Sequence, residues 1–147
     1  MINIYGTGEW AKKITSLLNV GEYGQYDSTN YDQAQADLPW VIALEDGNDR
    51  LTVANTVLNG SLFHTLFDGC KTLDGSVIGK GLVVGCCSLV RPGTRIGDQV
   101  YIGANSVIDI NCTIEDGVTI GDNVTVYEGV TIPANTEVPS GSVVKNS

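Results

Sequence analysis

An aliphatic residue recurs at every sixth position over the second half of the chain, from residue 78 to residue 144. The series consists of Ile78, Val84, Val90, Ile96, Ile102, Ile108, Ile114, Ile120, Val126, Ile132, Val138 and Val144. A period of six matches neither the 3.6 residues per turn of an α-helix nor the two-residue alternation of a free hairpin. An unbroken short period is typical of a solenoid of stacked β-strands. The sequence therefore predicts such a coil over this region.

The period further predicts a triangular coil, with one hexapeptide per side and about 18 residues per turn, each turn rising by about one strand spacing of 4.8 Å. In each hexapeptide the aliphatic residue and the residue four positions later are expected to point inward. This second set is small or β-branched and includes Ser88, Thr94, Val100, Ser106, Cys112, Val118, Val124, Val130, Thr136 and Ser142. Glycines directly follow several of the aliphatic residues, and we expect them at corners that need an unusual φ: Gly79, Gly85, Gly97, Gly103 and Gly121.

Charge and cysteine usage restrict the function classes. The 147-residue chain has a net charge of −9, which argues against nucleic acid or an anionic membrane surface as a partner. We expect no membrane span and no signal peptide, and hence a cytoplasmic protein whose four cysteines are reduced thiols. Because His64 is the only histidine and the cysteines show no CxxC spacing, we expect no metal site.

A small α/β unit is predicted for residues 1–62, followed by the coil at 63–147. The predicted strands are residues 2–5, 40–44 and 61–67, and the predicted helices are residues 9–18 and 49–58. Between the first helix and Trp40, the polar segment supplies at most one short strand near Gln25-Tyr26. The order β-α-β-α-β implies a small parallel sheet with right-handed crossovers.

The turn Gly6-Thr7-Gly8 lies between the first predicted strand and the first helix. This arrangement can hold a phosphate at the helix N-terminus. The same glycines also suit a tight turn that binds nothing, and Glu9 in the first helical turn repels an anion. Both interpretations stay open on the sequence.

The hexapeptide repeat resembles the left-handed parallel β-helix of the hexapeptide-repeat acyltransferases, over residues 75–147. The small lobe ahead of the coil is similar to that of the sialic acid O-acetyltransferase and nucleotide-sugar N-acetyltransferase family. The segment from Val41 to Arg50 looks like the family's strand-turn-arginine stretch, and Leu62-Phe63-His64-Thr65 looks like its junction with the coil. In contrast to the family, Glu9-Trp10 stands where Gly-His is frequent.

This resemblance implies an acetyl-CoA-dependent acyltransferase that modifies a sugar or a nucleotide-linked sugar. It implies a homotrimer with active sites in the grooves between neighbouring coils. The residues that it assigns to the substrate are Gly6, Thr7 and Gly8, and those that it assigns to acetyl-CoA are Gly103, Thr119 and Gly121.

The catalytic histidine of the family is missing at the matching position. In the family, this histidine is followed by an acidic residue. Residues 107–112 match that stretch, with Ile110 at the histidine position and Asn111 at the acidic one. Thr119 matches a second histidine that some members carry. Activity would then depend on His64, on Asp109 beside the lost histidine, or on an amine acceptor that binds unprotonated and needs only positioning. The candidate catalytic residues are therefore His64, Asp109 and Asn111.

The charge of the later turns also bears on the function. Residues 96–144 contain no Lys or Arg but seven Asp and Glu residues, which disfavours the phosphates of coenzyme A. Positive charge is limited to earlier turns, at Lys71, Lys80, Arg91 and Arg95. Two functions remain open: a sugar acetyltransferase, and a catalytically silent relative that keeps the coil for binding or assembly.

Overall fold

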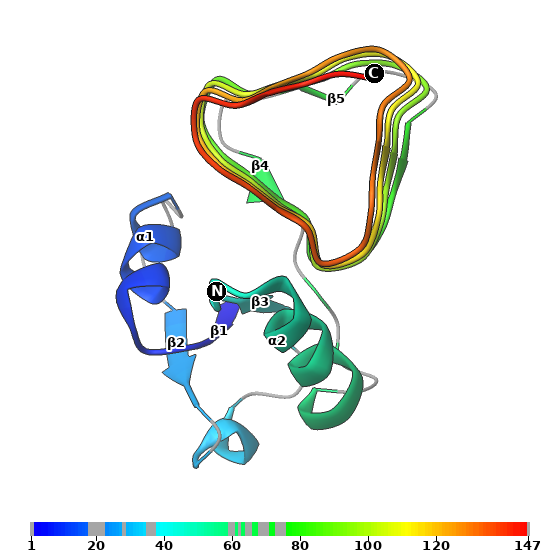
Figure 1. The fold of residues 1–147 in the computed structure, drawn as a ribbon. Helices are drawn as coiled ribbons and strands as arrows, with labels where there is room; N and C mark the ends of the chain where they lie inside the picture. Colours follow the sequence, from blue (N-terminus) through cyan, green and yellow to red (C-terminus); the bar gives the residue numbers. More distant parts are fainter. Residues whose placement is uncertain are drawn as a thin grey trace.

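A computed structural model shows a triangular coil with a small α/β lobe against one of its sides (Figure 1). It describes residues 2–17, 23–27, 29–34, 38–58, 61, 63, 66–67, 71–72 and 76–146. No helix among these residues is long and apolar enough to cross a membrane. The predicted fold class, a small βαβ-type lobe followed by a left-handed parallel β-helix, is confirmed.

The lobe is built on a parallel three-stranded sheet of order β2-β1-β3. Its strands are β1 (Ile2–Tyr5), β2 (Tyr23–Tyr26) and β3 (Trp40–Ile42). Helix α1 (Glu9–Leu17) follows β1, and a short 3-10 turn (Tyr31–Gln33) follows β2. The sequence prediction of a parallel sheet is confirmed, and the segment after α1 supplies a full strand of it. Apolar side chains of β1, α1 and β3 close one face of this sheet.

Helix α2 (Gly47–Thr52) begins after β3, and Asp46 caps it by accepting a hydrogen bond from the amide of Asp49 at 3.1 Å. A π-helical turn (Val53–Val57) continues it, so the helix begins two residues earlier than predicted and changes its hydrogen-bond pattern midway. The single strand predicted for residues 61–67 is wrong at the positions that the structure describes, while residues 62, 64 and 65 lie outside the described residues. Phe63 forms one bridge to Trp40 and packs in the lobe, whereas Leu66 and Phe67 already pair with the coil.

Short two-residue strands form the three sides of the coil. They are β4 (Leu66–Phe67), β5 (Lys71–Thr72), β6 (Val77–Ile78), β7 (Val83–Val84), β8 (Leu89–Val90), β9 (Arg95–Ile96), β10 (Tyr101–Ile102), β11 (Val107–Ile108), β12 (Thr113–Ile114), β13 (Thr119–Ile120), β14 (Thr125–Val126), β15 (Thr131–Ile132), β16 (Glu137–Val138) and β17 (Val143–Val144). We call β4-β7-β10-β13-β16 the first coil sheet, β5-β8-β11-β14-β17 the second and β6-β9-β12-β15 the third. From β6 onward, each strand pairs in parallel with the strand 18 residues away, as between Tyr101 and Thr119.

The interior of the coil contains the two inward sets that the sequence predicts. The aliphatic residues from Val84 to Val138 are buried, and so are their partners from Ser88 to Val130. Buried hydroxyls satisfy their hydrogen-bonding capacity within the stack: Ser106 Oγ donates to the carbonyl of Gly121 at 2.9 Å and accepts from the amide of Val124 at 3.1 Å. Small polar residues are therefore compatible with this core because each hydroxyl bonds to a neighbouring turn.

The positive φ angles fall on a different corner position from the one expected. They occur three residues after each aliphatic residue, with φ between 55° and 79°, at Gly81, Cys87, Gly93, Gln99, Asn105, Asn111, Gly117, Asn123, Gly129, Asn135 and Gly141. Gly and Asn predominate there because they tolerate the left-handed region best.

The glycines directly after the aliphatic residues are needed for a steric reason, so the expectation of unusual φ at these positions is wrong. A Cβ built on Gly79 would lie 2.5 Å from the carbonyl carbon of Gly97. One built on Gly121 would lie 2.6 Å from the amide nitrogen of Ser140. The next turn of the coil passes too close for any side chain at these sites.

The lobe packs on the first coil sheet and on the corner between the third and first sheets (Figure 1). Val83 and Tyr101 of this sheet join Ile4, Ala11 and Ile14 of the lobe in one buried apolar cluster. The outer face of the first sheet is consequently covered from β7 to β13, whereas Glu137 of β16 is exposed, and the second and third sheets keep their outer faces free of the lobe.

Candidate functional site

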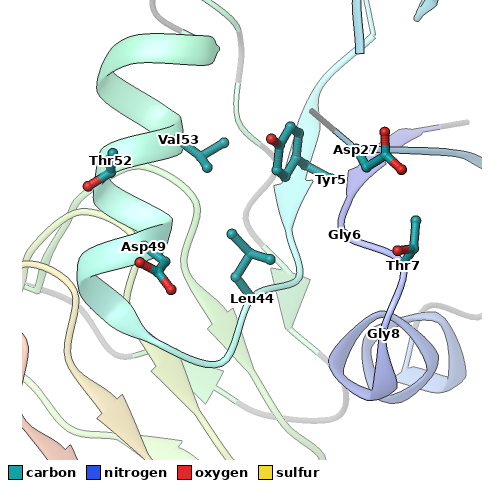
Figure 2. A pocket seen from close by; sticks show the side chains of 9 residues that line it. All are labelled: Tyr5, Gly6, Thr7, Gly8, Asp27, Leu44, Asp49, Thr52 and Val53. Atoms are coloured by element: carbon teal, nitrogen blue, oxygen red, sulfur yellow. The ribbon is translucent and has the colours of Figure 1, made fainter. Parts of the chain in front are cut away.

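The carboxyl ends of the three lobe strands surround a cleft of about 400 Å³, which we call the lobe cleft (Figure 2). Its lining residues are Tyr5, Gly6, Thr7, Gly8, Asp27, Leu44, Asp49, Thr52 and Val53. Strand β1 is central, and the chain crosses from β2 on one side of it to β3 on the other. Ligands of open parallel sheets bind at such a reversal of strand order, outside the carboxyl ends of the strands. All three glycine-turn residues that the sequence assigned to the substrate lie in this cleft.

Gly6 is required by the backbone of the turn. Its φ is +129°, and a Cβ at this position would lie 2.5 Å from the carbonyl oxygen of Ala43. Its amide donates to the carbonyl of Tyr26 at 2.8 Å, and its own carbonyl accepts from Nε2 of Gln25 at 3.0 Å. At Gly8, in contrast, an added Cβ would have no atom of the surrounding protein within 4 Å, so open space adjoins this residue. The turn thus has a fixed first residue and an accessible last one.

Asp27 lies directly after β2 and was not among the residues predicted from the sequence. Its Oδ1 accepts hydrogen bonds from the amide and the hydroxyl of Thr29, at 2.8 and 2.5 Å. These bonds lower the pKa of the Asp27 carboxyl, so the group is ionised at neutral pH. An acidic residue about 20 residues after a glycine turn, at the end of the second strand, is the position that binds ribose hydroxyls in dinucleotide-binding folds. That spacing was the available sequence signal.

The lobe cleft is acidic. Asp27 and Asp49 both line it, and neither Lys nor Arg occurs among its described lining residues. In Figure 2 the two carboxylates lie on opposite walls, with Leu44 between them. This arrangement suits a ligand that presents hydroxyl groups more than it suits a bare phosphate.

A second cleft of about 220 Å³ lies between α1 and the first coil sheet, and we call it the lobe–coil cleft. It is lined by Trp10, Lys13, Glu45, Tyr101, Thr119, Ile120, Gly121, Glu137, Val138, Pro139 and Ser140. The rings of Trp10 and Tyr101 meet edge to face with centroids 4.4 Å apart, and Lys13 Nζ lies 5.1 and 5.2 Å from the two ring centroids. Burial raises the pKa of the Tyr101 hydroxyl. Leu44 in the lobe cleft and Glu45 in this cleft are consecutive, so the two clefts flank the end of β3.

Two of the three predicted acetyl-CoA contacts, Thr119 and Gly121, line the lobe–coil cleft. Gly103 is their neighbour on the preceding turn, where a Cβ would lie 2.7 Å from the carbonyl carbon of Gly121. The hydroxyl of Thr119 is engaged within the protein: it accepts a hydrogen bond from Arg50 at 2.8 Å and donates to the carbonyl of Glu45 at 3.3 Å. Its place is therefore at the seam between lobe and coil.

Arg50 of α2 is the residue that holds this seam. Only 3% of it is exposed, and its guanidinium donates to the carbonyls of Leu44, Glu45, Gln99 and Val118 at 2.8–3.1 Å, besides the bond to Thr119. Burial lowers its pKa to about 10, so it remains a cation at neutral pH. In the sequence, Arg50 stood out only through the resemblance of residues 41–50 to the family's strand-turn-arginine stretch. That resemblance did not indicate these hydrogen-bond acceptors.

The predicted catalytic residues lie elsewhere. Asp109 and Asn111 occupy the corner between the second and third coil sheets, opposite the first sheet. Oδ1 of Asp109 accepts from the amide of Ile110 at 2.8 Å and lies 3.7 Å from the guanidinium of Arg91. Asn111 has φ of +57°, so the backbone of the corner accounts for its presence. His64 lies outside the described residues. Within one chain, the substrate, acetyl-CoA and coil-borne catalytic candidates thus lie at three separate places.

Three of the acidic residues on the later turns have structural roles at corners. The carboxylates of Asp98, Asp116 and Asp122 accept hydrogen bonds at 2.7–2.8 Å from backbone amides of the preceding turn. Each lies over a glycine of that turn, at Gly79, Gly97 or Gly103. Their presence is therefore explained by the coil itself and is not a sign of selection against an anionic ligand.

Comparison with known proteins supports the assignment of the coil. The family described as bacterial transferase hexapeptide (six repeats) matches residues 75–109 and 111–146. No curated protein matches the sequence significantly.

Several solved structures share the fold over nearly the whole chain. The acetyltransferase domain of PglB from Neisseria gonorrhoeae, in complex with acetyl coenzyme A, is 16% identical with a TM-score of 0.65, covering 97% of this chain and 94% of that one. A variant of perosamine N-acetyltransferase from Caulobacter crescentus, in complex with CoA and GDP-perosamine, is 18% identical with a TM-score of 0.68, covering 98% and 88%. WeeI from Acinetobacter baumannii is 15% identical with a TM-score of 0.60, covering 97% and 87%.

The sheets of the lobe and of the coil, the six-residue repeat and the structural neighbours all lead to the same assignment. The coil of this chain matches the bacterial hexapeptide-repeat transferases over residues 75–109 and 111–146, and the chain as a whole has the fold of the acetyltransferases to which it is similar.

Proposed function

We propose that this protein is an acetyl-CoA-dependent acetyltransferase whose acceptor is a nucleotide-linked sugar. The observation that carries the proposal is the lobe cleft, which combines the glycine turn after β1 with an ionised Asp27 after β2. A ribose can donate its hydroxyls to Asp27 while the turn accommodates the adjoining diphosphate. Among the structural neighbours, the perosamine N-acetyltransferase was solved with a GDP-linked sugar in place.

An amino group on the sugar is the acceptor that fits this chain best. An unprotonated amine can attack the thioester carbonyl, after which the C–S bond breaks and coenzyme A leaves as a thiolate that takes up the released proton. The protein then has to position the two reactants, which alone accounts for a large part of such a rate enhancement. This route fits the presence of Ile110 at the position of the usual histidine.

A homotrimer would bring the separated candidates together. The large apolar side chains that are most exposed among the described residues are Val77, Val143 and Tyr127, at 58%, 58% and 46%. All three lie on the second or third coil sheet or the corner between them, which also carries Asp109 and Asn111. In such a trimer, this corner would pack against the lobe side of a neighbouring copy, and the active site would be built from residues of two chains. A monomer in sedimentation velocity experiments would reject this arrangement.

A catalytically silent relative is the second candidate function. It is favoured by Ile110 at the position of the usual histidine and by the backbone role of Asn111. Between residues 107 and 112, the titratable side chains are then the Asp109 carboxylate and the Cys112 thiol. Burial raises the pKa of this thiol, which accordingly stays protonated and unreactive at neutral pH.

Calorimetric titration with acetyl-CoA and, separately, with GDP and UDP separates the two functions. Micromolar binding of acetyl-CoA together with binding of a nucleotide would support the transferase and direct the search to amino-sugar acceptors. Nucleotide binding without acetyl-CoA binding up to millimolar concentration would leave the silent relative. If neither ligand binds, the assignment of the lobe cleft is wrong.

Replacing Asp27 by asparagine is expected to weaken nucleotide binding by about tenfold, because a hydrogen bond from a ribose hydroxyl to an ionised acceptor is roughly twice as strong as one to a neutral amide oxygen. The matched control is Asp32→Asn, a change of the same charge in the 3-10 turn outside the cleft. The dissociation constant for the nucleotide is the measurement. Removing a negative charge by itself favours an anionic nucleotide, so equal losses in both variants would show that the effect does not come from a contact between Asp27 and the ribose.

A further inference from the structure

Two consecutive cysteines form an exposed pair at the corner between the first and second coil sheets. Cys86 and Cys87 follow β7, and their Sγ atoms are 3.3 Å apart. Both side chains are exposed, whereas Cys112 is buried inside the coil. Neither cysteine belongs to the sites described above.

The backbone of this corner is unusual at Cys87. Its φ is +61°, in the left-handed region, where the other described corners of the coil carry Gly, Asn or, once, Gln. A cysteine has no side-chain oxygen that would compensate locally for this conformation, as Asn has. Gly and Asn tolerate this conformation better and occupy most of the other described corners. A cysteine in this conformation therefore points to a role for its side chain.

The corner is also held in place. The carbonyl of Cys86 accepts the amide of Asn105 at 2.9 Å, and the hydroxyl of Ser88 donates to the carbonyl of Gly103 at 2.5 Å. The next turn of the coil thus holds the peptide between the two cysteines and the side chain of the residue that follows them. The two thiols stay adjacent and facing solvent without any rearrangement of the fold.

A metal ion is a poor occupant for this pair. Structural zinc takes four protein ligands, and no group of three or more His, Cys, Asp or Glu side chains suitable for a metal occurs in the described part of the chain. Thiol–disulfide chemistry needs only the two sulfurs and an accessible approach, and the pair provides both.

We propose that Cys86 and Cys87 are a redox modification site, a vicinal dithiol that a low-molecular-weight disulfide oxidises to an intramolecular disulfide. One thiolate attacks the external disulfide and releases one molecule of the small thiol. The second protein thiol then attacks the mixed disulfide and releases the second small thiol. The protein loses two electrons and two protons, and the external disulfide gains them.

The resulting bond is readily reversible. Consecutive Cα atoms are about 3.8 Å apart across a trans peptide, below the usual range of about 4.4–6.8 Å for disulfides. A disulfide strained in this way is more easily reduced than a structural one. The pair therefore acts as a labile modification and does not staple the coil.

Mass spectrometry after treatment with oxidised glutathione tests the proposal. Cleavage after Lys80 and Arg95 yields a tryptic peptide of residues 81–95, because the bond between Arg91 and Pro92 resists trypsin, and this peptide contains both cysteines and no other. After oxidation and alkylation of the remaining thiols, we expect it unalkylated and two hydrogen atoms lighter, and fully alkylated again after dithiothreitol. Recovery of the wild-type peptide fully alkylated, or only as glutathione adducts, would overturn the proposal.

Three variants separate chemistry from folding. Cys86→Ser and Cys87→Ser each keep one thiol, so the glutathione mixed disulfide is expected to accumulate instead of the internal bond. Cys87→Asn removes the second thiol and places a residue suited to positive φ, so it should raise Tm while abolishing the internal disulfide. If Cys87 of the Cys86→Ser variant is recovered alkylated and without glutathione, that thiol does not react with the external disulfide and the assigned pair is wrong.

Discussion

Replacing Arg50 by methionine is expected to lower the free energy of unfolding by about 3–5 kcal/mol, because each buried acceptor left without a donor costs about 1–3 kcal/mol. The guanidinium is buried and satisfies carbonyls of Leu44, Glu45, Gln99 and Val118 as well as the hydroxyl of Thr119. Methionine fills a similar volume but donates no hydrogen bond, and backbone acceptors cannot be removed by mutation. Several buried acceptors would therefore lose their partner at once.

Thermal and urea unfolding measure this effect, and a fall in Tm on the order of 10 °C is expected for a chain of this size. Arg95→Met is the matched control, because Arg95 is exposed on β9, and its change should stay within about 0.5 kcal/mol. Arg50→Lys should fall between the two, since one ammonium group cannot reach acceptors on both lobe and coil. Equal stability of the Arg50→Met and Arg95→Met variants would show that the lobe is held by its apolar contacts alone.

Replacing Gly97 by alanine is expected to destabilise the coil by about 1–3 kcal/mol, as overpacking of a rigid interior does. A Cβ on Gly97 would lie 2.7 Å from the amide nitrogen of Asp116 and would overlap Oδ1 of the same residue. Asp116 has little freedom to move away, because its Oδ1 accepts the amide of Asp98 at 2.7 Å and its carbonyl accepts the amide of Asn135 at 2.9 Å. The added methyl group would therefore separate two turns of the coil.

Gly129→Asn is the matched control for this prediction. Gly129 has φ of +73°, and the nearest atom to a Cβ there is Nδ2 of Asn146 at 3.9 Å. Asn occupies the same corner position on other turns, so the variant should differ from the wild type by less than about 0.5 kcal/mol in urea unfolding. If Gly129→Asn is the more damaging change, backbone conformation limits these corners more than the spacing of the turns does.

Much of the candidate site could be predicted where its residues are neighbours in the sequence. The glycine turn Gly6-Thr7-Gly8 was recognised from the strand and helix on either side of it, and it does line the lobe cleft. Asp27 was missed although its spacing from that turn was visible, because β2 was not recognised as a full strand of the sheet. Thr119 and Gly121 were assigned to acetyl-CoA through the family resemblance; they line one cleft because they are only two residues apart, and their role stays a prediction.

The sequence by itself determined the coil, because each inward residue is specified by its position in a six-residue period and by contacts with the turns 18 residues before and after. It could not determine where the lobe lies. That placement depends on Arg50 and its acceptors up to 69 residues away, and on Tyr101 packing against Trp10. It could not locate the strained corner positions either, since either glycine set of the repeat could carry the positive φ. Both features depend on distances between backbone segments that are far apart in the sequence. Only tertiary packing sets these distances, so no local sequence pattern indicates them.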